Sequence, residues 1–439
     1  METQASTSST PKGRRAVIVA GVRTPFVKAF KELLELDAIA LGVAAVDALL
    51  HRTELPRREL DSVIWGGVIL PGLAPNVGRE IVLDLKLPAS VEAYTVTRAC
   101  ATGLQAVTLA AAAIERGDAD VVIAGGSDST SNAEIKLPQK VVHAMAPLAF
   151  GKATPADMLG VLAQLTPIRD ILPKRPKIAE RTTGQVMGEA AEEMARRNGI
   201  ARADQDAFAV RSHHRAAAAI ASGRLRDEVT PVQAPGGRWV HGDTLVRADT
   251  SVEQLGKLRP VFSRDGTLTA GNSSPLTDGG AAVLLMSEDK ARALGYTPLA
   301  RFRSWSFVGV DPADQLLMGP ALAMPKALDR AGFSLAEMDF IDMHEAFAAQ
   351  VLSVLKMLGS AAFARARLGQ DHAIGEVDPD KLNVHGGSVA LGHPFGATGA
   401  RMVTTMANEL HRTGKRLALL GICAAGGLGA GAVLENAES

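Results

Sequence analysis

The residues most able to do chemistry in this chain are its two cysteines and one of its histidines. Cys100 lies between a run of β-branched and aromatic residues, 93–97, and an Ala- and Leu-rich run, 102–114, that leads to Gly117. These patterns predict a strand, a tight turn and a helix, which places the Cys100 sulfur near the free N–H groups of a helix N-terminus. Such a position can lower the pKa of the thiol from about 8.5 to roughly 3.5–7.5, whereas a buried, unreactive cysteine is the alternative interpretation.

The histidine and the second cysteine lie in two glycine-rich stretches of the C-terminal part. His393 stands in the segment 386–401, GGSVALGHPFGATGAR, ahead of a predicted helix. Cys423 ends a predicted strand and is followed by Ala-Ala-Gly-Gly-Leu-Gly. A thiolate nucleophile, a histidine base and a second proton-transfer group are what acyl transfer through a thioester requires. The sequence therefore predicts acyl-transfer chemistry if the three side chains share one pocket.

The same three side chains, Cys100, His393 and Cys423, could in principle bind zinc. Thiolates and imidazoles are the ligands that zinc prefers. However, no C-x₂-C or H-x₃-H spacing supports such a site in this sequence. We therefore expect no metal.

Composition indicates a soluble enzyme of more than one structural unit. The 439 residues carry 47 Lys and Arg against 47 Asp and Glu, and 47% are hydrophobic. The absence of a basic excess argues against nucleic-acid binding, and the length predicts two or three units. Two cysteines provide no disulfide framework and favour a reducing compartment. The first thirteen residues lack the apolar segment of a secretory signal, and no apolar run approaches the ~20 residues of a membrane helix, so we expect a cytoplasmic location.

Strands and helices alternate along most of the chain, which predicts a parallel sheet covered by helices. The predicted strands are 14–20, 62–70, 93–97, 120–126, 279–286, 299–310, 340–343, 384–391, 417–422 and 431–435. The predicted helices are 38–50, 102–114, 189–197, 203–222, 320–331, 346–358 and 397–410.

The two ends of the chain echo each other. Ala101-Thr-Gly103 opens a helix after a predicted strand, and Ala397-Thr-Gly399 opens its counterpart. The predicted strand that contains residues 121–126 and the stretch 419–427 likewise occupy equivalent places in the two halves of the chain. We therefore expect two duplicated βαβ halves whose helices meet in the middle.

The pattern changes between about residues 131 and 277. The stretch 136–181 carries eight Lys and Arg residues against three acidic ones, with several prolines and apolar pieces. This composition predicts an inserted loop region. It could meet an anionic, greasy ligand or a membrane surface, or it could simply be a solvated basic face.

Four motifs together resemble the thiolase family, and the resemblance covers nearly the whole chain. It is closest to the long-chain 3-ketoacyl-CoA thiolase β subunits of fatty-acid oxidation multienzyme complexes. The motifs are Arg98-Ala-Cys-Ala-Thr102, His344-Glu-Ala-Phe-Ala348, Gly392-His-Pro394 and Cys423-Ala-Ala-Gly-Gly427.

This resemblance implies the α/β thiolase fold, in which two similar halves form five layers (αβαβα) and carry an inserted loop domain. The N-terminal half would be 14–130, completed by 276–296. The loop domain would be 131–275, with CoA, substrate and partner contacts. The C-terminal half would be 297–439.

The implied activity is CoA-dependent cleavage of a 3-ketoacyl-CoA into acetyl-CoA and a shortened acyl-CoA, the last step of fatty-acid β-oxidation. Cys100 would carry the acyl group, and His393 would take its proton. Cys423 would protonate the departing acetyl-CoA carbanion, or deprotonate acetyl-CoA in the condensing direction. One oxyanion pocket would use His393 and a water held by His344, and the other would use the backbone N–H groups of Cys100 and Ala425.

Two positions depart from the common family pattern. His344 stands where most thiolases carry Asn, and because histidine changes charge near neutral pH we expect some pH dependence there. Ala425 stands where the family often has glycine. An alanine keeps the N–H, so the second pocket survives unless the site needs a positive φ.

The resemblance also implies where coenzyme A, a co-substrate rather than a tightly bound cofactor, would contact the chain. Ser274 stands at the pantetheine-contacting position of the loop 270–276, and Met187 and Phe347 match other wall positions. Phe347 could equally be a core residue. The basic stretch 136–181 suits the CoA phosphates.

Several alternatives share part of this pattern. An acetoacetyl-CoA-forming biosynthetic thiolase would use the same residues, and a β-ketoacyl synthase shares fold and nucleophile but has histidine where this chain has Cys423. A non-catalytic scaffold subunit would dock a hydratase/dehydrogenase partner. The resemblance implies a homodimer, which could stand within an α₂β₂ complex, and peripheral membrane contact stays open.

Overall fold

The computed structural model describes residues 13–135, 137–151, 154, 160–161 and 179–439. The described chain through Asn132 forms one compact unit with Glu180–Ser439, and the segment Ala133–Ala179 forms a second. The second unit contains helix α4 (Gln139–Phe150). Six of the eight basic residues of the stretch 136–181 lie outside the described residues, so the function suggested for that stretch stays a prediction.

The N-terminal half of the large unit is built on strands in the order β4–β3–β5–β8–β1. β3 is parallel to both β4 and β5, whereas β8 is antiparallel to β5 and β1. The short strand β2 pairs with β8 beside this path. The strands are β1 (Ala16–Arg23), β2 (Val27–Lys28), β3 (Ser62–Gly66), β4 (Glu92–Val96), β5 (Val121–Ser129) and β8 (Thr277–Ser287).

The C-terminal half repeats this topology in the order β10–β11–β12–β9. β10 is parallel to β11, and β12 is antiparallel to β11 and β9. β9 and β1 join the two halves at the pair Ile18 and Ala300. The expected duplication is therefore visible, but the purely parallel sheet is wrong, because β8 and β12 return antiparallel into it. The strands are β9 (Ala300–Gly309), β10 (Phe340–Met343), β11 (Leu417–Ala424) and β12 (Leu428–Asn436).

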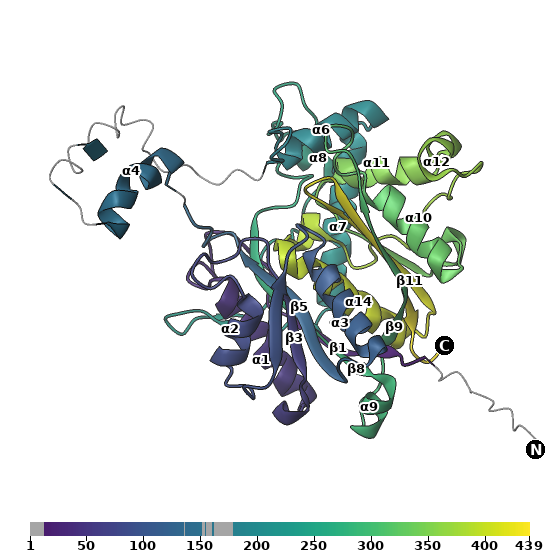
Figure 1. The fold of residues 1–439 in the computed structure, drawn as a ribbon. Helices are drawn as coiled ribbons and strands as arrows, with labels where there is room; N and C mark the ends of the chain where they lie inside the picture. The colour runs from purple at the N-terminus through teal and green to yellow at the C-terminus, as the bar shows by residue number, and fades with distance from the viewer. Residues whose placement is uncertain (1–12, 136, 152–153, 155–159, 162–178) are drawn as a thin grey trace, which may run out of the picture. The chain divides into compact units, whose positions relative to one another are not determined.

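Helices cover the outer face of each half of this continuous sheet and also pack between the two halves, which gives five layers (Figure 1). Strand β11 shows why, since its side chains alternate between two faces. Leu420 and Ile422 pack in the inner core with α3 and α14, whereas Leu419 and Cys423 pack in the outer core with α10 and α11. The layer helices are α1 (Ala38–Thr53), α2 (Val77–Asp84), α3 (Thr102–Arg116), α6 (Met187–Asn198), α10 (Pro320–Ala331), α11 (Ala348–Leu358) and α14 (Phe395–Thr413).

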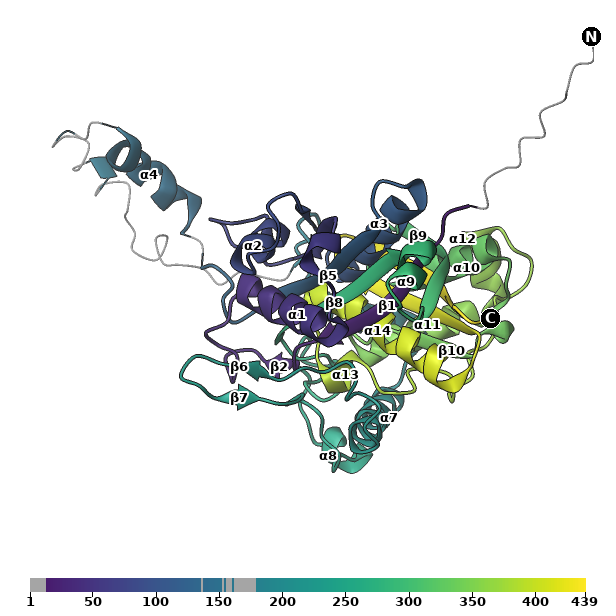
Figure 2. The same cartoon turned by 90° about the horizontal axis from the view of Figure 1, so that it is seen from below.

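The remaining elements are shorter or lie beside the layers. Figure 2 shows α7 and α8 side by side, whereas the β6–β7 hairpin lies beside β2. Among the described residues, no helix combines the length and the apolar character that a membrane crossing requires. These elements are β6 (Val232–Gln233), β7 (Trp239–Val240), α7 (Arg202–Ala221), α8 (Val252–Gly256), α9 (Glu288–Ala293), α12 (Ala361–Leu368), α13 (Ser388–Leu391), η1 (Arg57–Glu59) and η3 (Leu335–Glu337).

Three strand predictions need correction. The strand predicted over 62–70 stops at Gly66. The Gly67 N–H still donates to the Val96 carbonyl of β4, but the N–H groups of Val68 and Ile69 donate to the Asp128 carboxylate instead of to a strand. The strand predicted over 14–20 continues to Arg23 through pairing with β8. The predicted strand 384–391 is a turn followed by helix α13, and a buried apolar run of that length fits either structure.

Candidate active site

Cys100 lies on the turn between β4 and α3, as the sequence predicts. The preceding Ala99 has φ 44°, a left-handed conformation that costs energy for a residue other than glycine. The turn is held by the Arg98 N–H, which donates to Thr102 Oγ1 at 2.6 Å. Cys100 keeps part of its surface exposed, whereas Cys423 is buried. Cys100 is therefore the cysteine that a substrate can reach.

The environment of Cys100 favours the neutral thiol. Burial of the sulfur raises its pKa to about 11, and this outweighs the backbone N–H groups of Ala425 and of Cys100 itself, which lower it. The sequence prediction of a lowered pKa is wrong for the free protein, because desolvation penalises the thiolate more than the nearby N–H groups stabilise it. The thiol consequently needs a base before it can attack.

His393 is held on both sides by threonines. Its N–H donates to Thr277 Oγ1 at 3.0 Å, and its Nδ1 lies 2.7 Å from Thr398 Oγ1. Gly392 before it has φ 101°, and an added Cβ would lie 2.8 Å from the Thr277 side chain, so only glycine fits there. Burial, together with the charge of Arg401, lowers the pKa of His393 to about 3.

His344 follows β10 and is held in the same way. Its Nδ1 lies 3.0 Å from Ser388 Oγ, and its backbone N–H donates to the Gly421 carbonyl at 2.8 Å. Burial, followed by the His393 and Arg401 charges, lowers the pKa of His344 well below its usual value. The expected change of charge near neutral pH is therefore wrong, because this imidazole is neutral there.

The structure brings Cys100, His344 and His393 into one cluster. The Cys100 sulfur and one ring nitrogen of each histidine lie within 4.8 Å of one another. The two rings are 4.1 Å apart between centroids, with 47° between their planes. Within the described chain, both Nε2 atoms are buried without a hydrogen-bond partner. Two unpartnered imidazole nitrogens next to a thiol can accept a proton and contact a polarised oxygen.

Cys423 reaches the same region from the end of β11, where it pairs with Gly429 of β12. Burial and then the charge of Cys100 raise its pKa well above the usual value, so the two thiols are electrostatically coupled. The N–H of Ala425 bonds to the Cys100 sulfur. The positive φ angles of this loop fall on Gly426 and Gly427, so the alanine at 425 costs nothing.

Close contact between two helix starts makes this convergence possible. An added Cβ on Gly103 of α3 would lie 2.4 Å from the Gly396 carbonyl oxygen of α14. An added Cβ on Gly399 would lie 2.2 Å from the Leu104 nitrogen. The glycines of the two Ala-Thr-Gly repeats thus let the helices touch through their backbones, which sets Cys100 beside His393.

Several polar residues that hold the site are not among those expected from the sequence. Ser388 and Thr398 stand five residues before and after His393 in its own glycine-rich stretch, which is the signal that could have identified them. Glu345 accepts hydrogen bonds from Ser212, at 2.6 Å, and from Asn383, at 2.7 Å. Its place beside His344 in the quoted motif could likewise have identified it.

The three residues expected to contact CoA lie on connected segments. The N–H of Ser274 donates to the Ala346 carbonyl at 2.9 Å, which ties the loop 270–276 to the segment after His344. Phe347 packs edge-on against Phe262, with 5.8 Å between ring centroids. Met187 belongs to the same apolar cluster. Phe262, which the sequence does not single out, therefore packs beside two of the residues expected to contact CoA.

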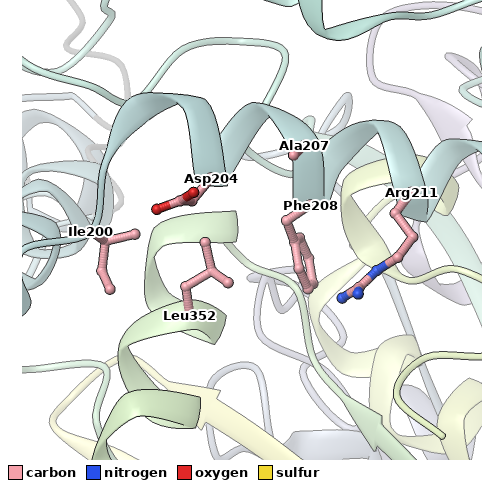
Figure 3. A pocket seen from close by; sticks show the side chains of 6 residues that line it. All are labelled: Ile200, Asp204, Ala207, Phe208, Arg211 and Leu352. Atoms are coloured by element: carbon pink, nitrogen blue, oxygen red, sulfur yellow. The ribbon is translucent and has the colours of Figure 1, made fainter. Parts of the chain in front are cut away.

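A separate pocket of about 460 Å³ lies between α7 and α11 (Figure 3). The Arg211 guanidinium of this pocket stands over the Phe208 ring at 5.2 Å. None of the catalytic candidates lines it. We therefore assign this pocket no part in catalysis. Its lining residues are Ile200, Asp204, Ala207, Phe208, Arg211 and Leu352.

Comparison with known proteins matches both halves to one family. Residues 16–289 match the thiolase N-terminal domain, and residues 296–436 match the thiolase C-terminal domain. The chain is 47% identical over 430 residues to the 3-ketoacyl-CoA thiolase of Pseudoalteromonas translucida (98% of each chain). It is 48% identical over 428 residues to that of Yersinia pestis strain Pestoides F (97% of this chain, 98% of the relative).

Solved structures show the same likeness. The acetyl-CoA acetyltransferase of Bacillus anthracis superposes with a TM-score of 0.81 at 32% identity, covering 96% of this chain and 99% of its own. The human mitochondrial 3-ketoacyl-CoA thiolase does so with a TM-score of 0.81 at 31% identity, covering 97% and 99%.

Proposed function

This chain belongs to the thiolase family of acyltransferases, and from that premise we propose that it cleaves 3-ketoacyl-CoA through an acyl group carried on Cys100. The observation that carries the proposal is the clustering of the Cys100 sulfur with a nitrogen of His344 and of His393 within 4.8 Å. A nucleophile within reach of an oriented base is the arrangement that covalent acyl transfer needs.

In the first half-reaction the Cys100 sulfur attacks the 3-keto carbon, and its proton passes to Nε2 of His393. Thr398 holds Nδ1, so that Nε2 keeps the lone pair that receives the proton. As the thioester forms, the bond between carbons 2 and 3 breaks, and its electron pair stays with the acetyl-CoA carbanion. Cys423 gives this carbanion its thiol proton.

In the second half-reaction free CoA attacks the acyl thioester. Cys423 takes the CoA thiol proton, the new carbon–sulfur bond releases the shortened acyl-CoA, and the Cys100 sulfur recovers the proton from His393. The N–H groups of Ala425 and Cys100 face the sulfur side of the site, where they stabilise an oxyanion. His344 and His393 offer Nε2 atoms for the other oxyanion, His344 through a water. One such donor is worth about 2.7–4 kcal/mol in a comparable hydrolase site.

We propose that Ser274, Met187 and Phe347 line the wall of the site that contacts CoA. CoA acts as a co-substrate, and we propose no tightly bound cofactor. Phe262 supports the wall by its contact with Phe347. We propose that the chain has three parts. They are an N-terminal half of residues 14–130 and 276–296, a loop domain of residues 131–275 and a C-terminal half of residues 297–439. Within this division the loop domain contacts CoA and partners.

The setting we propose is fatty-acid β-oxidation in the cytoplasm, with the chain as a homodimer that can join an α partner. Two relatives that share 47–48% identity bear the name 3-ketoacyl-CoA thiolase. The structural likeness to an acetyl-CoA acetyltransferase supports a second candidate, acetoacetyl-CoA synthesis. A series of 3-ketoacyl-CoA chain lengths separates the two, because the second candidate acts on acetoacetyl-CoA alone.

The test is CoA-dependent cleavage of acetoacetyl-CoA and of a long-chain 3-ketoacyl-CoA by the native chain and by Cys100→Ala. We expect cleavage by the native chain and a loss of at least about 10³-fold in kcat in the variant, since covalent nucleophiles carry effects of this size or larger. Equal activity in both proteins would end the proposal.

A further inference from the structure

The catalytic cluster has the donor set of a zinc site. A thiol and two imidazoles are soft ligands that suit Zn²⁺. Their donor atoms lie within 4.8 Å of one another. Zn–S and Zn–N bonds of about 2.3 and 2.0–2.1 Å at a tetrahedral angle put the donors roughly 3.3–3.6 Å apart, so the side chains must close on the ion by up to about 1.5 Å. Cys100 is the partly exposed member of the set, so a dissolved ion can approach the cluster from the side of this residue.

The two histidines are oriented as metal ligands are. A metal-binding histidine usually donates its second ring N–H to an oxygen, which fixes the ring and leaves the other nitrogen free for the metal. Ser388 Oγ stands 3.0 Å from Nδ1 of His344, and Thr398 Oγ1 stands 2.7 Å from Nδ1 of His393. Both Nε2 atoms are left without a partner among the described residues, in residues that are 0% and 5% exposed. The cluster does not include Cys423, so this site differs from the zinc alternative considered above.

We propose that Cys100, His344 and His393 bind one soft divalent cation, Zn²⁺ or its substitute Co²⁺, in the free enzyme and that this cation reversibly blocks the acyl site. The cation is an inhibitor here, and the reaction does not use it. Three protein ligands leave the fourth position of a tetrahedral ion open to water.

The chemistry of binding is a simple exchange. The sulfur–hydrogen bond of Cys100 breaks, its proton leaves to solvent, and a metal–sulfur bond forms without any change of oxidation state. A metal-bound sulfur cannot be acylated, and an acylated sulfur cannot bind the metal. Cation and acyl donor therefore compete. Because a proton is released, binding tightens as pH rises.

The experiment uses the full chain and Co²⁺ as a spectroscopic probe. We expect thiolate-to-cobalt charge-transfer absorption that saturates at one equivalent per chain and disappears when Zn²⁺ is added. Zn²⁺ should inhibit thiolysis in competition with the 3-ketoacyl-CoA, and a chelator should restore activity. Inhibition that a chelator does not reverse, or a native protein without the absorption, overturns the proposal.

Variants identify the ligands by the cobalt signal, independently of activity. Cys100→Ala and His344→Asn should lose it, whereas Cys423→Ala should keep it. Ser388→Ala should weaken cobalt binding about 10–100-fold, as expected for a residue that orients a ligand. If Cys100→Ala does not fold, alkylation of Cys100 in the native chain serves instead and should abolish the signal. A signal that survives loss or alkylation of Cys100 overturns the proposal, whatever the catalytic activity.

Discussion

At the scale of single residues, the thiol of Cys100 and the two imidazoles of this site are neutral in the free protein. Burial raises the pKa of the Cys100 thiol and lowers the pKa of both imidazoles, so a thiolate–imidazolium pair is not the resting state. In the proposed mechanism, the proton therefore moves from Cys100 to His393 as the sulfur attacks and the substrate carbonyl accepts the negative charge. Burial thus prevents the idle enzyme from carrying a reactive thiolate, and the N–H groups of Ala425 and Cys100 act when charge develops.

The separation of roles between the two cysteines can be tested at Cys423. We expect Cys423→Ala to accept an acyl group on Cys100 but to lose overall turnover about 10²–10⁴-fold, the usual contribution of a proton-transfer group. Intact-protein mass spectrometry after incubation with a 3-ketoacyl-CoA or an acyl-CoA detects the adduct. The matched control is Cys100→Ala, which should show none. Absence of an adduct in Cys423→Ala would contradict the assignment.

At the scale of elements, two helix starts and two strand ends place the proposed reacting groups, since Cys423 lies at the end of β11. Helix α14 carries Thr398, which orients His393, and one turn later it carries Arg401. Strand β10 carries Asp342 and leads to His344. The ion pair between Arg401 and Asp342 spans 2.9 Å, and both side chains are at most 2% exposed. This pair therefore fastens the two histidine-bearing elements to each other.

Replacing Arg401 should change both stability and pH dependence. Its charge lowers the pKa of His344 and His393, so the acidic limb of kcat/KM in the native enzyme should lie below the ordinary histidine pKa of about 6.5. In Arg401→Met both pKa values rise toward that value, the base becomes protonated at higher pH, and the limb moves to higher pH.

Controls separate this charge effect from unfolding. Arg401→Met alone strands the Asp342 charge and should cost about 3–5 kcal/mol in the free energy of unfolding. Adding Asp342→Leu removes the stranded charge, so the double variant should recover stability yet keep the shifted limb. Arg401→Lys keeps a positive charge and should keep the native limb. An unmoved limb in the double variant would show that Arg401 serves packing alone.

The glycine contact between α3 and α14 gives a second prediction at this scale. Gly399→Ala would place a Cβ 2.2 Å from the Leu104 nitrogen. The two helices must then separate, which increases the distance between Cys100 and His393. Overpacking of this kind costs about 1–3 kcal/mol, and a 1 Å displacement can cost about 10²-fold in rate. Thermal unfolding and kcat measure the two effects. The control is Gly256→Ala, whose Cβ meets nothing within 4 Å and which should leave both unchanged.

At the scale of the whole molecule, the site lies at a seam between two halves that repeat one topology. Asp128, on β5 of the N-terminal half, accepts the N–H of Gly396 of α14 at 2.6 Å and that of Ile69 at 2.6 Å. One buried carboxylate therefore joins the loop after β3 to the helix that follows His393. Burial raises its pKa to about 6.

Asp128→Asn should destabilise the protein by about 1–3 kcal/mol, because an amide presents N–H where Gly396 or Ile69 needs an acceptor. A carboxyl whose pKa is higher in the folded state adds stability that is complete below the unfolded pKa of about 3.9 and is lost as pH rises through about 6. The stability difference between native and variant chains should therefore be larger at pH 5 than at pH 8. Denaturant unfolding at both pH values measures it, and a difference that grows with pH would refute the burial argument.

The sequence alone determined the candidate residues for the chemistry and most of the elements that hold them. Cys100, His393, Cys423 and His344 are recognisable because their motifs are local, and helix α10 and strand β10 begin and end where periodicity predicts. The fold of two halves also follows from the repeated pattern. Such features depend on neighbours in the chain, so they can be read from it.

Only the tertiary structure decided the protonation states and the strand directions. The pKa values of Cys100 and His344 differ from those that the sequence predicts, because desolvation depends on atoms that arrive from distant segments. The buried run 384–391 forms a turn and a helix and not a strand. In this conformation Ser388 Oγ contacts Nδ1 of His344, and the Val389 N–H donates to the Glu345 carboxylate. Burial and polar satisfaction are properties of the packed molecule, and no local pattern contains them.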